Sequence, residues 1–277
     1  MKGWIALDID GTVTNDLHRI PDEVTSYLAT LSDSGWQILF ITGRAFLTAY
    51  PLLQKLSFPY FLAVQNGADL ISMPERRLIR RLYLDQSILP LLETIYTNCA
   101  EDFLVYGGYD RGDICYYRPH RFSDTVGPYL EKLKGGFSSK WVQVDHFNFP
   151  EIATFPVIKC FGVEKEMQGV AEMIQKETRC HATTIHDRFS GRFHLTMITH
   201  IEATKGEALQ AAVGRHNSFP IIAAGDDFND ETMLDIADLR IVIRTAPEAM
   251  HKKAHILADS AAECGIIGAL KQAVLQV

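Results

Sequence analysis

The stretch WIALDIDGT, residues 4–12, decides the fold of this chain. Its apolar first half predicts a buried strand, and Asp8 and Asp10 follow with one residue between them. On an extended strand this spacing directs both carboxylates to the same face, and Gly11 then allows the backbone to turn sharply. Asp and Gly are also ordinary turn residues. Two carboxylates at the carboxyl end of a strand can nevertheless hold a cation and attack an electrophile, which is the arrangement that phosphoryl transfer requires.

The composition is ordinary for a globular protein. The chain has 277 residues, of which 47% are hydrophobic and 22% charged, with a net charge of −7. This length allows about two domains, and the acidic balance gives no support for a nucleic-acid or acidic-membrane partner. The sequence shows no signal-peptide pattern, no run of the roughly 20 apolar residues that span a bilayer, and no CxxC pair. We therefore expect a cytoplasmic protein with reduced thiols.

Strands and helices alternate over the first third of the chain, which predicts parallel strands joined by right-handed crossovers. The expected elements are strands at 4–8, 37–41 and 60–64, and helices at 21–33 and 45–56, the second helix kinked or broken at Pro51. Ligands bind outside the carboxyl ends of the strands in such sheets. Asp8, Thr42 and Asn66 all fall at these ends.

The alternation stops after Asn66 and resumes near Thr204. A hairpin is expected at 69–84, and the residues after it combine helical stretches with aromatic-rich strands. The later segment again has apolar strands, at 220–224, 240–243 and 255–257. We therefore predict an α/β protein with a Rossmann-like parallel-sheet core. Its expected divisions are a core of residues 1–84 and 200–277 and an inserted α+β cap domain of residues 85–199.

Four pieces of sequence are thereby expected to meet at one sheet edge: the carboxylate pair at 8 and 10, Thr42, Lys205 and the acidic loop GDDFND at 225–230. A divalent cation and a lysine would allow a carboxylate nucleophile to approach an anionic phosphate, and oxygen ligands suit Mg²⁺. Taken singly, Thr42 also fits a helix cap, Lys205 a surface residue, and the loop acids a first helical turn. Their joint occurrence favours an active site.

These residues resemble the motifs of a known superfamily. Residues 8–12 (DIDGT), 42–44 (TGR), Lys205 and 225–230 (GDDFND) resemble, in the right order, the four motifs of the haloacid dehalogenase-like (HAD) phosphatases. Residues 66–68 (NGA) and the long insertion resemble its Cof-type sugar-phosphatase branch. The resemblance implies a Mg²⁺-dependent phosphatase that hydrolyses a small phosphorylated metabolite, with a sugar phosphate favoured.

The resemblance also implies catalytic roles. Asp8 would be the nucleophile that forms an aspartyl-phosphate, and Asp10 would act as general acid and then as general base. Asp8, the backbone carbonyl of Asp10 and Asp226 would hold Mg²⁺. Thr42 would bind the transferring phosphoryl group, and Lys205 would neutralise its charge.

Other motif residues would support this group. Gly43, Asn66 and Asn229 would line the phosphate pocket, and Asp230 would support the lysine or a metal-bound water. Asp227 is expected to be structural. We expect the arginine of the TGR motif, Arg44, to brace the core against the cap.

Two features leave the substrate open. Thr245 stands where the branch usually has Asn, and Arg244 precedes it as an additional cation. Substrate contacts near this loop are therefore expected to differ. In the insertion, aromatic and basic side chains cluster at 116–121 (YYRPHR). We expect these side chains to decorate a strand surface.

Three alternatives to a phosphatase fit parts of the same pattern. A phosphomutase on this scaffold would keep the phospho-aspartate until the phosphate returned to a rebound sugar. A receiver-type phospho-acceptor module also pairs acids with Thr and Lys around Mg²⁺, but the Asp-x-Asp spacing and the long insertion disfavour it. A catalytically idle binding protein is disfavoured because every chemical position is filled.

Overall fold

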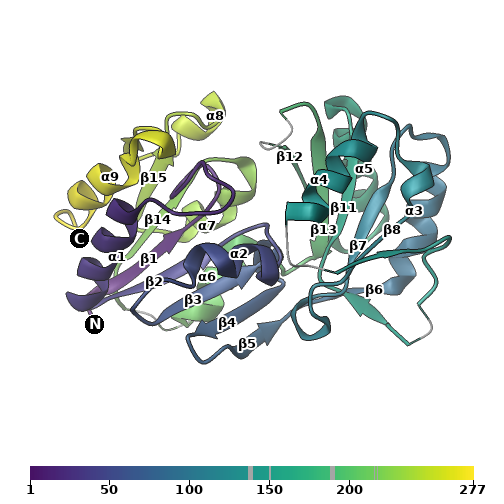
Figure 1. Ribbon diagram of the computed structural model, residues 1–277. Helices are drawn as coiled ribbons and strands as arrows, with labels where there is room; N and C mark the ends of the chain where they lie inside the picture. The colour runs from purple at the N-terminus through teal and green to yellow at the C-terminus, as the bar shows by residue number, and fades with distance from the viewer. Residues whose placement is uncertain (137–139, 150, 188–190, 215, 217) are drawn as a thin grey trace. The chain divides into compact units, whose positions relative to one another are not determined.

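The apolar run before Asp8 forms the strand β1 (Gly3–Leu7), in which every residue is buried. This strand pairs in parallel with β14 (Ile221–Gly225) on one side and with β2 (Trp36–Ile41) on the other. The complete sheet has the order β16-β15-β14-β1-β2-β3-β4-β5, and Figure 1 shows β1 in purple between its neighbours. A strand that is covered on both faces and paired on both edges accounts for the continuous apolar run.

The computed structural model describes residues 1–136, 140–149, 151–187, 191–214, 216 and 218–277. The chain divides into two compact units. The first consists of Met1–Arg44, Ala49–Arg81 and Thr204–Val277, and the second of Ala45–Thr48 and Leu82–Ala203. The second unit is thus mostly one continuous segment that interrupts the first in sequence.

The first unit follows the predicted alternation, and the predicted α/β class with a parallel sheet is confirmed. Its other strands are β3 (Tyr60–Val64), β4 (Asp69–Met73), β5 (Arg77–Arg81), β15 (Leu239–Ile243) and β16 (Ile256–Ala258). Its helices are α1 (Asp22–Asp33), α6 (Lys205–Val213), α7 (Glu231–Ile236), α8 (Glu248–His251) and α9 (Gly265–Ala273), while α2 (Phe46–Leu53) begins in the short segment grouped with the second unit. The strands from β16 to β3 are parallel, and β4 and β5 extend the sheet as an antiparallel hairpin.

The expected helix at 45–56 is shorter than predicted and is not broken at Pro51. Helix α2 passes through Pro51 and ends at Leu53. A proline removes one backbone donor and crowds the preceding turn. Because α2 ends only two residues after Pro51, few intrahelical hydrogen bonds lie beyond the defect.

Two groups of helices cover the sheet of the first unit. Trp4 and Ala6 point to one face, where they join a core that includes residues of α6 and α7. On the other face, α1 and α9 pack against each other and against strands β2, β15 and β16. In α1, Val24, Leu28 and Leu31 form the buried stripe, as the helical spacing predicts.

The second unit has its own sheet and its own core. Its main sheet has the order β12-β13-β11-β7-β8-β9 and is antiparallel except between β8 and β9. The strands are β6 (Leu84–Asp85), β7 (Phe103–Tyr106), β8 (Cys115–Tyr117), β9 (Trp141–Gln143), β10 (Thr154–Phe155), β11 (Ile158–Gly162), β12 (Cys180–His186) and β13 (His194–His200), and the helices are α3 (Leu89–Ile95), α4 (Val126–Gly136) and α5 (Glu164–Glu177). Apolar residues of α3, α5 and this sheet form one buried cluster.

The expectation that residues 116–121 decorate a strand surface is wrong for two of them. Tyr117 and Arg118 are buried. Arg118 binds both carboxylate oxygens of Asp102 at 2.8 and 2.7 Å and Glu93 at 2.6 Å. Its guanidinium also lies over the ring of Phe147. A buried arginine is tolerated when its charge is paired in this way, so this residue belongs to the interior of the second unit.

Candidate active site

Polar residues follow the carboxyl ends of four adjacent strands of the first unit. Asp8 follows β1, Thr42 follows β2, Asp226 follows β14, and Asn66 lies two residues after β3. Because β14, β1, β2 and β3 are neighbours and parallel, these residues share one edge of the sheet. The arrangement predicted from the strand ends is therefore present.

A tight turn fixes the residues that follow β1. The amide of Asp8 still donates to the carbonyl of Ala224 on β14, and the amides of Val13 and Thr14 both donate to the carbonyl of Ile9. Gly11 adopts a φ of +87°, which side chains rarely allow, and its amide donates to the Thr14 carbonyl. The backbone on both sides of Asp8 is thus held in place.

Lys205 lies at the first position of α6 and reaches the nucleophile candidate directly. Its Nζ donates to Asp8 Oδ1 at 2.5 Å and to Asp230 Oδ1 at 2.6 Å, and all three side chains are buried. The hydroxyl of Thr204 caps the helix by accepting from the Glu207 amide. Lys205 is therefore a buried residue, and the alternative of a surface lysine is excluded.

Glycine at position 67 permits that close approach. A Cβ on Gly67 would lie 2.6 Å from the Thr204 carbonyl oxygen, and Gly67 also has a φ of +94°. A side chain here would push away Thr204, the residue that precedes α6. Gly67 therefore helps to place Lys205 beside Asp8.

Burial and charge act in opposite directions on this pair. Burial raises the pKa of Asp8 from its ordinary value of 3.8 to about 7, with contributions from the Asp230 and Asp10 carboxylates and opposition from Lys205. For Lys205, burial lowers the pKa, but the carboxylates of Asp230 and Asp8 raise it by more, so the net shift of its pKa is upward. The lysine is therefore a permanent cation in this site.

The acidic loop after β14 is held by its own hydrogen bonds. Asp230 Oδ2 accepts from the amides of Asp226 and Asp227 at 2.8 and 3.0 Å. Asp227 caps the short turn of residues 228–230 by accepting from the Phe228 amide, which fits its expected structural role. A Cβ on Gly225 would lie 2.5 Å from Asp230 Cγ, so only glycine allows this packing. One carboxylate of the loop thus organises the backbone that presents Asp226.

The side chains of Asp8, Asp226 and Asp230 are suited to a divalent cation. One carboxylate oxygen from each lies within 4.8 Å of the others, and all three residues are buried. A set of buried carboxylate oxygens without nitrogen or sulfur donors fits Mg²⁺ rather than a softer metal. Asp230 was expected to support the lysine or a metal-bound water; it binds Lys205, and its carboxylate also lies within this group. The carboxylate of Asp10 is not in it, and the role of its backbone carbonyl as a ligand stays a prediction.

Thr12 is a site residue to which sequence reasoning gave no role. Its Oγ1 donates to Asp226 Oδ1 at 3.0 Å, and the residue is fully buried. The two positions are 214 residues apart in sequence, so no local pattern predicts the contact. A hydrogen bond of this kind orients the carboxylate of Asp226.

Thr12→Val is therefore expected to weaken Mg²⁺ binding by about 10–100-fold without unfolding the protein. The substitution keeps the shape of the side chain and removes the donor to Asp226. Binding can be followed by titration calorimetry with Mg²⁺ alone. Thr12→Ser keeps the hydroxyl and should retain most of the affinity; equal affinities for Val and Ser variants would show that the hydrogen bond does not matter.

The remaining predicted phosphate-binding residues lie at the ends of β2, β3 and β14. Thr42 Oγ1 accepts from the amide of Arg44 at 3.1 Å, which leaves the Thr42 hydroxyl proton available to a ligand. Gly43 separates these two residues in the turn. Asn229 Nδ2 donates to Asn66 Oδ1 at 3.1 Å, so the structure joins these two amides.

Asp10 has a partner that the sequence did not suggest. Both of its carboxylate oxygens accept hydrogen bonds from Arg44, at 2.7 and 2.5 Å. Arg44 was expected to brace the core against the cap, which stays a prediction; within the first unit its guanidinium binds the candidate acid and base. At the loop where the sequence departs from the family pattern, Arg244 pairs with Asp259 at 3.0 Å and Thr245 is exposed.

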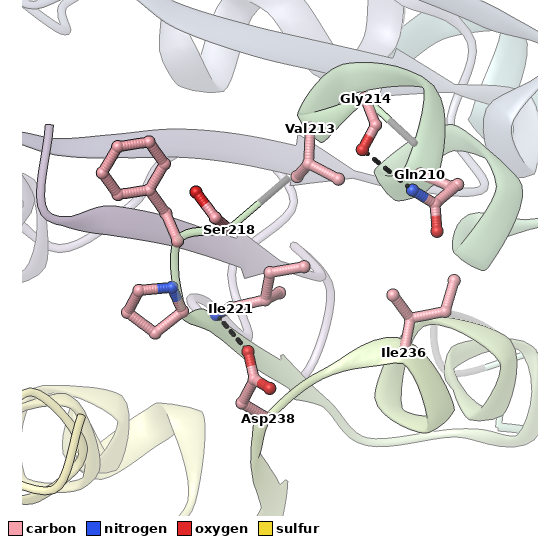
Figure 2. Close-up of a pocket in the computed structure, with 9 residues that line it drawn as sticks. Gln210, Val213, Gly214, Ser218, Ile221, Ile236 and Asp238 are labelled. Atoms are coloured by element: carbon pink, nitrogen blue, oxygen red, sulfur yellow. Dashed lines mark hydrogen bonds between the residues drawn. The ribbon is translucent and has the colours of Figure 1, made fainter. Parts of the chain in front are cut away.

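A separate pocket of about 490 Å³ lies at the opposite end of β14. Its lining includes Val213, Ile221, Ile236 and Asp238 (Figure 2). Ile221 begins β14, whereas the candidate site follows the end of this strand. The Asp238 carboxylate is already used, because it accepts from the Ile221 amide at 2.8 Å. This pocket is therefore not part of the candidate active site.

The fold and the site define an α/β protein with a buried acidic centre at the carboxyl edge of its sheet. Residues 5–270 match the family model of the haloacid dehalogenase-like hydrolases. The chain belongs to the haloacid dehalogenase-like hydrolase family. The membership that the four motifs predicted is thereby confirmed.

Similarity to individual proteins extends over nearly the whole chain. It is 25% identical over 279 residues to the 5-amino-6-(5-phospho-D-ribitylamino)uracil phosphatase YwtE of Bacillus subtilis, covering 95% of this chain and 94% of that one. It is 23% identical over 249 residues to the HMP-PP phosphatase of Serratia proteamaculans, covering 87% and 83% of the two chains. The solved structure of the HAD subclass IIB sugar phosphatase BT4131 shares the fold with a TM-score of 0.75 at 18% identity, over 98% of each chain.

None of the helices in the part of the chain that the structure describes has the length and apolar character needed to span a membrane.

Proposed function

We propose that this protein is a Mg²⁺-dependent phosphatase that hydrolyses small phosphomonoesters, with sugar phosphates as the favoured class, through an aspartyl-phosphate on Asp8. The observation that carries the proposal is the buried group in which Lys205 binds Asp8 and Asp230 beside Asp226. The phosphatase class rests on the family and on relatives that are named phosphatases. The metal, the intermediate and the substrate class are our inference.

In the first step, a carboxylate oxygen of Asp8 attacks phosphorus and the bond to the leaving oxygen breaks. The ammonium group of Lys205 offsets the negative charge shared by the nucleophile and the phosphoryl group. Thr42 donates its free hydroxyl proton to a phosphoryl oxygen, and Asp10 supplies the proton that the leaving alcohol requires. Asn66 and Asn229 line the same pocket, with Gly43 allowing the backbone to lie close to the phosphoryl group.

In the second step, water attacks phosphorus and the bond to Asp8 breaks. Asp10, now a carboxylate, accepts the proton of the water, and inorganic phosphate leaves with the site restored. Asp8, Asp226 and the backbone carbonyl of Asp10 would hold Mg²⁺, with Asp230 close by. When bound, the cation supplies charge neutralisation for the phosphoryl group.

We also propose a division of labour between the two units. The first unit carries every residue named in these two steps. The second unit, whose main segment Leu82–Ala203 nearly matches the predicted insertion at 85–199, would act as the cap that selects the substrate and excludes water. The favoured substrate class is supported by the sugar phosphatase that shares the fold and by relatives, matched over most of their length, whose names specify small phosphorylated compounds.

The test is phosphate release from a panel of sugar phosphates and other small phosphomonoesters, with Mg²⁺ or with excess chelator. We expect release with Mg²⁺ and at least about a 10³-fold loss with chelator, because two anions must meet without the cation. Equal rates in both conditions would refute the metal requirement. Isomer conversion that needs a bisphosphate primer, without net release, would instead identify the phosphomutase alternative, which the named relatives do not favour.

A further inference from the structure

Arg44 donates hydrogen bonds to both carboxylate oxygens of Asp10. Its Nε donates to Asp10 Oδ2 at 2.7 Å, and its Nη2 donates to Oδ1 at 2.5 Å. Its Nη1 donates to the Leu17 carbonyl at 2.9 Å. A two-point contact between planar groups fixes direction as well as distance, and the third hydrogen bond prevents the guanidinium from turning.

Backbone contacts hold both Arg44 and Asp10 in place. The amide of Arg44 donates to Thr42 Oγ1 at 3.1 Å, and its carbonyl accepts from the Gln65 amide at 2.8 Å. Asp10 forms a β-bridge with Thr14 inside the turn that follows β1. The Arg44 side chain is only 7% exposed, whereas that of Asp10 is 21% exposed. The arginine is thus enclosed, and the carboxylate keeps an open side.

We propose that Arg44 is a positioning residue that orients the carboxyl group of Asp10 so that it can take the proton of the hydrolytic water. This inference rests on the proposed function and deepens it. A carboxylate offers about four lone-pair directions, and Arg44 occupies two of them. A free lone pair on the open side accepts the water proton while water oxygen bonds to phosphorus and the bond to Asp8 breaks.

With an activated substrate, the transfer step should depend little on Arg44, whereas hydrolysis of the aspartyl-phosphate should depend on it strongly. With p-nitrophenyl phosphate, the leaving phenolate needs little help from an acid. Without Arg44, transfer to Asp8 should therefore remain fast while hydrolysis of the aspartyl-phosphate slows by about 10²-fold, the usual cost of a misplaced catalytic group. A direct contact of Arg44 with substrate would instead raise KM.

The experiment is a pair of kinetic measurements on Arg44→Met. Rapid mixing with p-nitrophenyl phosphate and Mg²⁺ should show a burst of about one nitrophenolate per enzyme, followed by a slow phase. In this phase kcat and KM should both fall, so that kcat/KM stays close to that of the wild type. The second measurement is a double-mutant cycle with Asp10→Asn. Loss of Arg44 should have almost no further effect on the slow phase when Asp10 is already replaced, since two residues that act as one unit are not additive.

Controls separate positioning from folding. Arg44→Lys retains the charge but cannot bind both oxygens, so it should show an intermediate rate. Arg19→Met removes an exposed arginine that pairs with Asp16 in the same loop, and should leave the rate unchanged. If Arg44→Met unfolds, the Lys variant carries the test through its burst and its cycle with Asp10→Asn.

Additive losses in the cycle, a loss confined to KM, or a slow phase at the wild-type rate would each overturn the inference. In each of these cases the wild-type protein would still hydrolyse its substrates, so the proposed function would stand. Failure of the proposed function would look different, because the wild-type protein would release no phosphate from any substrate.

Discussion

Asp8→Asn is expected to lower phosphate release by on the order of 10⁴-fold or more while the protein stays folded. An amide oxygen is too weak a nucleophile to form the covalent intermediate. The substitution keeps the size of a side chain that is held in place by backbone hydrogen bonds on either side. The measurement is the rate of phosphate release with Mg²⁺, accompanied by a circular dichroism spectrum.

A matched control is Asp33→Asn, which replaces an exposed carboxylate at the end of α1. It should leave turnover unchanged. Turnover of Asp8→Asn near the wild-type rate would rule out Asp8 as the covalent nucleophile.

The thermal stability of Asp8→Asn should depend on pH differently from that of the wild type, because Asp8 titrates and Asn does not. Burial raises the pKa of Asp8 to about 7 in the folded protein, from an ordinary value of 3.8. The folded state therefore binds this proton more tightly, and the wild type loses stability as pH rises through this window. Asn does not titrate. In metal-free buffer, the Tm of the variant minus that of the wild type should grow from pH 4 to pH 7 and then level off.

Lys205→Met is expected to damage both stability and turnover. Lys205 is 1% exposed and binds Asp8 and Asp230 at 2.5 and 2.6 Å. Its removal leaves two buried carboxylates without their cation, which costs about 3–5 kcal/mol of unfolding free energy. Turnover should fall by about 10²–10³-fold, because charge on the phosphoryl group is no longer neutralised. Urea unfolding and phosphate release measure the two effects.

A second substitution can separate these effects. Adding Asp230→Asn to Lys205→Met removes one of the uncompensated charges, so part of the lost stability should return while turnover stays low. Lys176→Met, at a lysine whose side chain is 80% exposed, should change neither quantity. An unfolding free energy of Lys205→Met equal to that of the wild type would contradict the buried ion-pair assignment.

The fold and the meeting of the site residues could be predicted because both follow from short patterns. Each parallel strand is buried on both faces and so appears as an apolar run, and the polar residue that follows it lies at the ligand-binding edge. Such strand ends predict that Asp8, Thr42, Asn66 and Asp226 lie at one edge of the sheet, as they do. Their roles in catalysis remain predictions that the variants above test.

The pairing of side chains could not be predicted in the same way. Neither the contact of Thr12 with Asp226 nor that of Arg44 with Asp10 has a local sequence signal, because both depend on how separate strands bring their loops together. In the second unit, Arg118 was expected at a strand surface because nothing in its sequence fixes which face points inward, but it is buried, and Asp102 compensates its charge. Helix α2 tolerates Pro51 because the helix ends two residues later, so little of it lies beyond the missing backbone donor.

The position of β1 between β2 and β14 has a consequence for synthesis on the ribosome. Residues 1–81 contain β1 to β5 and can pair among themselves as they emerge, but the other edge of β1 finds its partner only when residues 221–225 follow. Until then the growing chain presents an unpaired apolar strand, a known template for aggregation. Chains cut short before β14 should therefore be insoluble as well as inactive, since the strand that completes the sheet also leads into Asp226.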